Sequence, residues 1–227
     1  MTGTLFVVAT PIGNLEDITL RALRVLREAD VIAAEDTRRT ARLLGRHGIQ
    51  TPTISFHEHN TRSRVPQLLT RLEAGESVAL VTDAGTPSIS DPGVELVRAC
   101  IGKGVAVDSI PGPSAPITAA SLSGFPLDSL TVLGFPPARA AERKKWMEAL
   151  AILPHTVSFF EAPHRIRATL SEAALILGNR QIMVGRELTK IHQELLRGPA
   201  GAVLEALTSA RGEFTVVVGP MIIERTS

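Results

Sequence analysis

Along the first half of the chain, short apolar runs take turns with stretches in which apolar residues recur at helical spacing. Short β-branched runs bounded by polar or turn residues are typical of buried strands. These expected strands are Leu5–Ala9, Val31–Ala34, Thr53–Phe56, Val78–Val81 and Val105–Ile110. Stretches with apolar residues at helical spacing separate them, at Leu20–Glu28, Thr40–His47, Arg62–Ala74 and Val94–Lys103. This α/β alternation predicts a mostly parallel sheet with helices on both faces.

The second half of the chain begins after a segment rich in proline and glycine, Pro111–Pro116. Few regular elements run through such a segment, so we place a domain boundary there, between residues 1–115 and 116–227. Beyond it we expect helices at Ile117–Leu122, Ala138–Ala151, Arg165–Leu177 and Gly201–Ser209. The expected strands are Ser129–Leu133, Thr156–Phe160, Gln181–Glu187, Gln193–Arg197 and Phe214–Val218. The third and fourth of these strands are close enough for a hairpin, which favours a mixed sheet in a second α/β domain.

Composition narrows the class of protein. With 44% hydrophobic and 21% charged residues, the chain is predicted to be folded and not disordered. No apolar run is long enough for a membrane span, and the first residues lack the basic region of a signal peptide. Cys100 is the only cysteine, which excludes an internal disulfide and a multi-cysteine zinc site. We therefore expect a cytoplasmic protein.

The net charge of +1 does not support binding of nucleic acid by charge alone. Basic residues do form local clusters, one of which is Arg139, Arg143, Lys144 and Lys145. Each cluster is either a solvated helix face or part of an RNA surface. The composition thus allows RNA binding without requiring it.

Three loops follow expected strands and hold more Gly, Pro and small polar residues than plain connections need: Thr10–Asn14, Asp83–Gly93 and Pro111–Pro116. In open α/β sheets such loops line the ligand site, and glycine lets backbone approach a ligand closely. None has the pattern of a phosphate-binding P-loop or of a dinucleotide-binding turn. The loops therefore favour an adenosine ligand without phosphates, and S-adenosylmethionine is the commonest such cofactor.

The motifs resemble those of the tetrapyrrole-methylase superfamily. They are Thr10–Leu15, Glu35–Arg38, Asp83–Gly93 (DAGTPSISDPG), Pro111–Ala115, Glu161–Arg165, Gly185–Lys190 and Gly212–Phe214. Within the superfamily they are similar to the branch of ribosomal RNA small-subunit methyltransferase I, which places a 2′-O-methyl group on a cytidine of the decoding region. The resemblance runs from about Leu5 to Pro220. The eleven-residue loop from Asp83 is its most specific part.

This resemblance implies a homodimer of two-domain subunits that binds S-adenosylmethionine in the cleft between the domains. The implied cofactor residues are Pro11, Ile12, Gly13, Asp83, Ala84, Gly85, Thr86, Ile89, Ser114 and Ala115. Thr86 stands where related methylases usually carry aspartate, so the hydrogen bonds of those enzymes do not transfer in detail. The implied substrate is small-subunit ribosomal RNA or the assembled subunit, with no metal and no membrane involved.

A ribose hydroxyl is a poor nucleophile, so the enzyme needs in-line placement and a group that steers or accepts the hydroxyl proton. Glu187 and Lys190, just past an expected strand, are the candidate catalytic pair. A structural ion pair at the dimer interface is the alternative. His57, Glu58 and His59 form another polar group, which we interpret as solvated residues and not as a metal or base site.

Two other functions stay open from the sequence. The chain could methylate a small tetrapyrrole-type molecule, although Thr86 and the arginine-rich surface argue against this. It could also be a non-catalytic RNA-binding factor of ribosome assembly, although intact cofactor loops argue against that reading.

Overall fold

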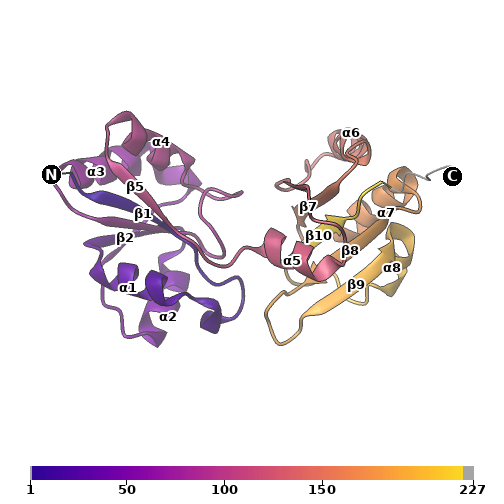
Figure 1. Cartoon of the computed structure of the whole chain (residues 1–227), viewed down its shortest axis with the longest axis horizontal. Helices are drawn as coiled ribbons and strands as arrows, with labels where there is room; N and C mark the ends of the chain where they lie inside the picture. The colour runs from indigo at the N-terminus through magenta and orange to yellow at the C-terminus, as the bar shows by residue number, and fades with distance from the viewer. Residues whose placement is uncertain (1, 222–227) are drawn as a thin grey trace. The chain divides into compact units, whose positions relative to one another are not determined.

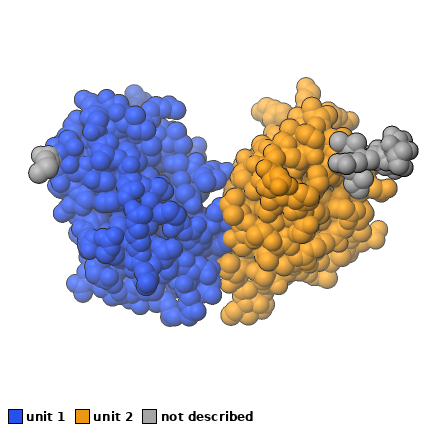
Figure 2. All heavy atoms as spheres, viewed as in Figure 1, with its two compact units in different colours: residues 1–114 blue, residues 115–227 orange. Residues whose placement is uncertain are grey.

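The computed structural model describes residues 2–221, which fold into two compact units (Figure 2). The first unit comprises residues 1–114 and the second residues 115–227. The predicted domains also include residues 1 and 222–227, which lie outside the described residues. That these units act as separate domains stays a prediction. Within residues 2–221, no helix is long and apolar enough to cross a membrane.

A parallel five-stranded sheet forms the centre of the first unit, in the order β3-β2-β4-β1-β5. Its strands are β1 (Thr4–Val8), β2 (Val31–Ala34), β3 (Thr53–Ser55), β4 (Val78–Val81) and β5 (Ala106–Ile110). Leu5 of β1 lies opposite Val78 of β4 on one side and Val107 of β5 on the other. The predicted parallel sheet is therefore confirmed.

Helices cover both faces of this sheet, as predicted. Figure 1 shows α1 (Leu20–Glu28) and α2 (Thr37–Arg46) on one face, and α3 (Thr61–Glu73) and α4 (Val94–Gly102) on the other. Successive strand residues point to opposite faces. In β4, Val78 and Leu80 belong to the core with α3 and α4, whereas Ala79 and Val81 belong to the core with α1 and α2. Burial on both faces explains why the strand is apolar throughout.

Some local boundaries differ from the prediction. Helix α2 begins at Thr37 and not at Thr40, because the Asp36 carboxylate accepts a hydrogen bond of 2.8 Å from the Arg38 backbone N–H and caps the helix there. Two 3₁₀ turns, η1 (Leu15–Asp17) and η2 (Glu58–Asn60), were not predicted. Three residues are too few to carry a hydrophobic period.

The second unit contains a five-stranded sheet in the order β6-β7-β10-β8-β9. Its strands are β6 (Leu130–Val132), β7 (Thr156–Glu161), β8 (Gln181–Arg186), β9 (Glu194–Pro199) and β10 (Phe214–Val218). β6 and β7 are parallel, and all other neighbours are antiparallel. The mixed sheet and the β8–β9 hairpin predicted from the sequence are thus confirmed.

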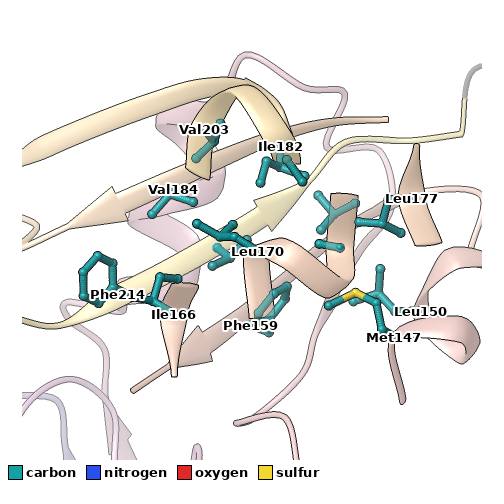
Figure 3. Packing of buried hydrophobic residues seen from close by; sticks show 14 of the residues in the cluster. Met147, Leu150, Phe159, Ile166, Leu170, Leu177, Ile182, Val184, Val203 and Phe214 are labelled. Carbon is teal, nitrogen blue, oxygen red and sulfur yellow. The ribbon is translucent and has the colours of Figure 1, made fainter. Parts of the chain in front are cut away.

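The helices of the second unit are α5 (Ala115–Ser123), α6 (Ala140–Ala151), α7 (Ile166–Leu177) and α8 (Ala200–Ala206). The main core lies between the sheet and α6, α7 and α8, where Met147, Phe159 and Leu170 are at most 1% exposed (Figure 3). Helix α5 packs against β10, β7 and β8. This core fixes the positions at which the loops of the second unit leave the sheet.

Candidate functional site

Two of the three predicted ligand loops meet at the carboxyl edge of the first sheet. They follow β1 and β4, which are neighbours. Thr10 and Gly85 exchange two backbone hydrogen bonds, of 2.9 and 3.0 Å. The Thr10 hydroxyl also donates to the Thr82 carbonyl at 3.0 Å. The first and second loops are therefore fixed to one another.

The third loop, after β5, contacts the other two. The Thr86 hydroxyl donates to the Pro113 carbonyl at 3.4 Å. A Cβ on Gly112 would lie 3.0 Å from the Ala9 Cβ, which is tighter than most real contacts. A Cβ on Gly85 would lie 3.5 Å from Ile12 Cγ2 and 3.8 Å from the Pro113 carbonyl oxygen. All three loops thus form one continuous surface of the first unit, which we call the loop surface.

The strand order makes this edge of the sheet a favourable place for a ligand. The chain leaves β1 toward α1 on one face of the sheet, but leaves the neighbouring β4 toward α4 on the other face. In open α/β sheets, ligands bind where adjacent connections diverge in this way.

The second loop has an unusual backbone. Gly85 is buried with φ +88°, and Ser88 and Ser90 have φ of 72° and 64°. Positive φ is unfavourable for residues with a Cβ and clusters at binding sites. Between the two serines, Ile89 is 44% exposed, whereas Ile12 of the first loop is 6% exposed. The loop surface thus has a buried glycine and an exposed apolar side chain beside it.

The other expected cofactor residues lie in or next to the loop surface. Pro11 is buried and Gly13 exposed, while Asp83, Ala84 and Thr86 are half-buried. Ser114 directly follows Pro113 and ends the first unit, whereas Ala115 is the first residue of α5 in the second. The structure therefore brings the residues of the first unit together, and their role in binding stays a prediction.

Carboxylates gather at the same edge of the sheet. One Glu35 oxygen accepts hydrogen bonds from the Thr82 hydroxyl and, at 3.1 Å, from the Asp83 N–H. Asp83 accepts from the Asp36 N–H at 3.0 Å and lies 3.4 Å from the Arg39 guanidinium. Sequence reasoning did not place Glu35 in the site, because the adjacency of β2 and β4 is not visible in local periodicity.

Burial, followed by the charge of Glu35, raises the pKa of Asp91 to about 6. The same two causes raise the pKa of Asp83, against the opposing charge of Arg39. Once ionised, the carboxylates of Asp83 and Asp91 add negative charge to this edge, which favours a positively charged ligand.

The shifted pKa of Asp91 predicts a pH dependence of stability. Since the folded pKa lies above the ordinary aspartate value of 3.8, the folded state holds more protons between the two values. The contribution of Asp91 to the free energy of unfolding is thus fully present below about pH 4 and is lost as the pH rises through about 6. Urea unfolding of the unaltered chain and of Asp91→Asn measures it. A decline of equal slope in both proteins would contradict the prediction.

The two candidate catalytic residues lie in the connection between β8 and β9. Lys190 Nζ is 2.8 Å from Glu187 Oε1 and 3.0 Å from Glu213 Oε2. Glu187 Oε1 also accepts from the Glu213 backbone N–H at 2.9 Å. Glu187 has φ +52°, so its backbone is strained. The structure brings Glu187 and Lys190 together and adds Glu213, which the sequence did not reveal because β10 pairs with β8 across a long separation.

The ion pair determines the charge of both side chains. For Lys190, burial lowers the pKa, but hydrogen bonds to Glu187 and Glu213 outweigh burial and leave the pKa raised. For Glu187, burial raises the pKa, but Lys190 and the Glu213 N–H leave it lowered. Both groups are charged at neutral pH. A charged lysine can orient a hydroxyl group but cannot accept its proton.

Of the three polar residues His57, Glu58 and His59, the first has a local structural role. The His57 ring lies 3.2 Å from the Asn60 amide nitrogen, and Asn60 also accepts from the His57 backbone N–H at 2.9 Å. These contacts shape the 3₁₀ turn η2. Among residues 2–221, no group of three or more His, Cys, Asp or Glu is arranged to hold a metal ion.

One member of the basic cluster on α6 does not face solvent. Arg143 is buried, and its guanidinium forms two hydrogen bonds of 2.9 Å with the Glu172 carboxylate of α7. Lys144 and Lys145 are exposed. The interpretation of Arg143 as a possible RNA contact is therefore wrong, because its side chain is committed to the packing of α6 on α7.

Arg143→Glu should destabilise the fold strongly, because it breaks a buried pair and places two carboxylates together. Breaking one partner of such a pair typically lowers the free energy of unfolding by about 3–5 kcal/mol. The matched reversal Lys144→Glu, at the next and exposed position, should change it by less than about 0.5 kcal/mol. Chemical denaturation measures both. Similar losses in the two variants would show that the Arg143–Glu172 pair does not matter.

Comparison with known proteins agrees with this architecture. Residues 4–204 match the family model of the tetrapyrrole (corrin/porphyrin) methylases. Solved structures with the same fold include diphthine synthase, with a TM-score of 0.71 and 14% identity over 95% of this chain and 89% of that one. Another is uroporphyrin-III C-methyltransferase from Thermus thermophilus in complex with S-adenosylhomocysteine, with a TM-score of 0.66 and 19% identity over 96% of this chain and 97% of that one.

Closer relatives carry a single name, ribosomal RNA small subunit methyltransferase I. The protein from Halalkalibacterium halodurans is 47% identical over 95% of this chain and 75% of its own length. The protein from Thermotoga maritima is 45% identical over 95% of this chain and 98% of its own length. The chain belongs to the tetrapyrrole methylases and, within them, to the family of ribosomal RNA small subunit methyltransferase I.

Proposed function

We propose that the chain transfers the methyl group of S-adenosylmethionine to the 2′-hydroxyl of a cytidine in small-subunit ribosomal RNA. It would act in the cytoplasm as a homodimer. The observation that carries the proposal is the loop surface, combined with about 45% identity to relatives named as small-subunit ribosomal RNA methyltransferases.

The loop surface fits this cofactor. Gly85, with φ +88°, exposes backbone where a side chain would contact Ile12, so an adenosine group could approach closely. The exposed Ile89 offers apolar contact. The carboxylates of Asp83 and Asp91 lie at the same edge and suit a ligand that carries a sulfonium and an amino group. When bound, the cofactor would supply an activated methyl group, which needs no metal.

We further propose that Lys190 and Glu187 orient the ribose hydroxyl. Both hydrogen bonds that Glu187 accepts fall on Oε1, so among the described residues Oε2 has no partner. This oxygen could accept the hydroxyl proton in a hydrogen bond while the charged Lys190 holds the carboxylate in place. The alternative is a structural ion pair at an interface between two copies.

A transfer assay with the purified chain tests the proposed function. Radiolabelled S-adenosylmethionine is incubated with small ribosomal subunits from cells that lack this protein, and separately with a tetrapyrrole such as uroporphyrinogen III. We expect label in the ribosomal RNA alone. Label in the tetrapyrrole alone would make the chain a small-molecule methylase. Cofactor binding without transfer to either substrate would also contradict the proposal.

A further inference from the structure

One aromatic ring of the second unit is unusually exposed. Phe135 lies in the loop between β6 and α6 and is 54% exposed, whereas every other Phe or Trp among residues 2–221 is buried or half-buried. Its ring packs on that of Phe160 in β7, with centroids 5.3 Å apart and a tilt of 31°. The two rings form a small surface, which we call the phenylalanine pair.

Hydrogen bonds hold the backbone of the loop that carries Phe135. The Phe160 backbone N–H donates to the Gly134 carbonyl at 3.3 Å. On the other side of Phe135, the Arg165 guanidinium donates to the Pro136 carbonyl at 3.0 Å. The backbone is therefore held immediately before and after Phe135, and the contact with the Phe160 ring supports the Phe135 side chain.

The buried carboxylate of Glu161 holds the Arg165 guanidinium in place. Arg165 is paired at 2.9 Å with Glu161, whose side chain is fully buried. The two Glu161 oxygens also accept from the Ala162 N–H and from the Thr169 hydroxyl. Burying a charge is expensive unless it is fully hydrogen-bonded. The motif Glu161–Arg165, which the cofactor and the hydroxyl do not explain, thus serves to fix the loop of Phe135.

Exposed basic residues follow the loop in the sequence. Lys144 and Lys145 are exposed on the first turns of α6, directly after the loop, and Arg139 is 84% exposed at the start of that helix. His164 is exposed next to Arg165. An exposed aromatic ring followed in the chain by exposed basic residues is a combination suited to unpaired nucleotides, since bases stack on aromatic rings and phosphates contact cations.

We propose that the phenylalanine pair is a stacking platform for an unpaired base of the RNA substrate. The proposal rests on the proposed function and goes beyond it, because it assigns a substrate-binding role to Phe135 and a positioning role to Arg165 and Glu161. A ring held in advance in its binding position loses little conformational entropy when the base stacks on it.

The test replaces Phe135 by Ala, Leu and Trp and measures the kinetics of methyl transfer to small ribosomal subunits. Loss of one stacked base should raise the KM of Phe135→Ala by about fivefold or more, because stacking contributes on the order of 1–3 kcal/mol per base. Phe135→Leu retains apolar volume without a π face, so its KM should rise similarly. Phe135→Trp should keep the KM of the unaltered chain. The affinity for S-adenosylmethionine should stay the same throughout.

Ile152→Ala provides the matched control, since Ile152 is 75% exposed at the other end of α6. Its KM should not change. A normal KM in Phe135→Leu would show that apolar volume suffices and would overturn the stacking platform. Dissociation of a dimer in Phe135→Ala would also overturn it, because the ring would then belong to an interface between copies.

Failure of the proposed function is distinguishable from failure of the platform. If the unaltered chain methylates no subunits, the platform is judged by binding of a labelled single-stranded oligocytidine and of the same oligomer without bases. Stronger binding of the intact oligomer, lost in Phe135→Ala, would support the platform. Equal affinity for both oligomers would contradict it.

Discussion

Gly85→Val is expected to weaken the binding of S-adenosylmethionine by about 100-fold or more, equivalent to about 2.7 kcal/mol. The β-carbon would project toward Ile12 Cγ2 and the Pro113 carbonyl, in the middle of the loop surface. Valine also disfavours the φ of +88°, so the second loop would change its path. Isothermal titration calorimetry with the purified variant measures the loss of affinity.

The matched control for this variant is Gly48→Val. Gly48 has φ +61° and open space around its Cβ position, just beyond α2. Both variants should therefore lose stability through backbone strain, by about 1–3 kcal/mol. Only Gly85→Val should lose cofactor affinity. Unchanged affinity in a folded Gly85→Val protein would remove the second loop from the cofactor site.

Lys190→Ala is expected to lower the rate of methyl transfer by about 100-fold or more, because Glu187, the group proposed to accept the hydroxyl proton, would lose its orientation, and losing a positioned acid–base group usually has an effect on this scale. Lys190 is the group that holds the Glu187 carboxylate, at 2.8 Å, and its removal would release both Glu187 and Glu213. Affinity for the cofactor should barely change, because Lys190 is proposed to act on the hydroxyl through Glu187 and not on the cofactor. Single-turnover kinetics with saturating cofactor separates the two effects.

Glu187→Ala should be slow as well, and the double variant should be little worse than either single one, as expected for residues that act as a unit. Lys190→Arg keeps the charge and serves as the conservative control, which should retain more activity than Lys190→Ala. Strictly additive losses, or dissociation of a dimer in either single variant, would favour the structural ion pair. A full rate without both residues would mean that placement alone suffices.

The regular elements could be predicted because burial leaves a clear pattern. Strands such as β2 and β4 are buried on both faces and are therefore continuous apolar runs. The burial of Arg143 could not be predicted in the same way. It shares the helical spacing of the buried Met147 and Leu150, but only the contact with Glu172 on α7 makes a buried arginine stable there.

The loops of the candidate site could be predicted from their local composition. The glycines and prolines of the loops mark positions at which backbone must be unusual, and Gly85 indeed has a positive φ. Glu35 and Glu213 belong to motifs of the sequence but received no role in the site, because each reaches its site only through strand pairing, of β2 with β4 and of β8 with β10. Such pairings are set by topology and leave no trace in the neighbouring residues.

The central claim is the 2′-O-methylation of a cytidine in small-subunit ribosomal RNA. Mass spectrometry of nucleosides from this RNA, taken from cells with and without the protein, tests it most directly. We predict that one 2′-O-methylcytidine is lost without the protein, returns when the unaltered chain is supplied, and does not return with Gly85→Val. An unchanged content of 2′-O-methylcytidine in cells that lack the protein would contradict the claim.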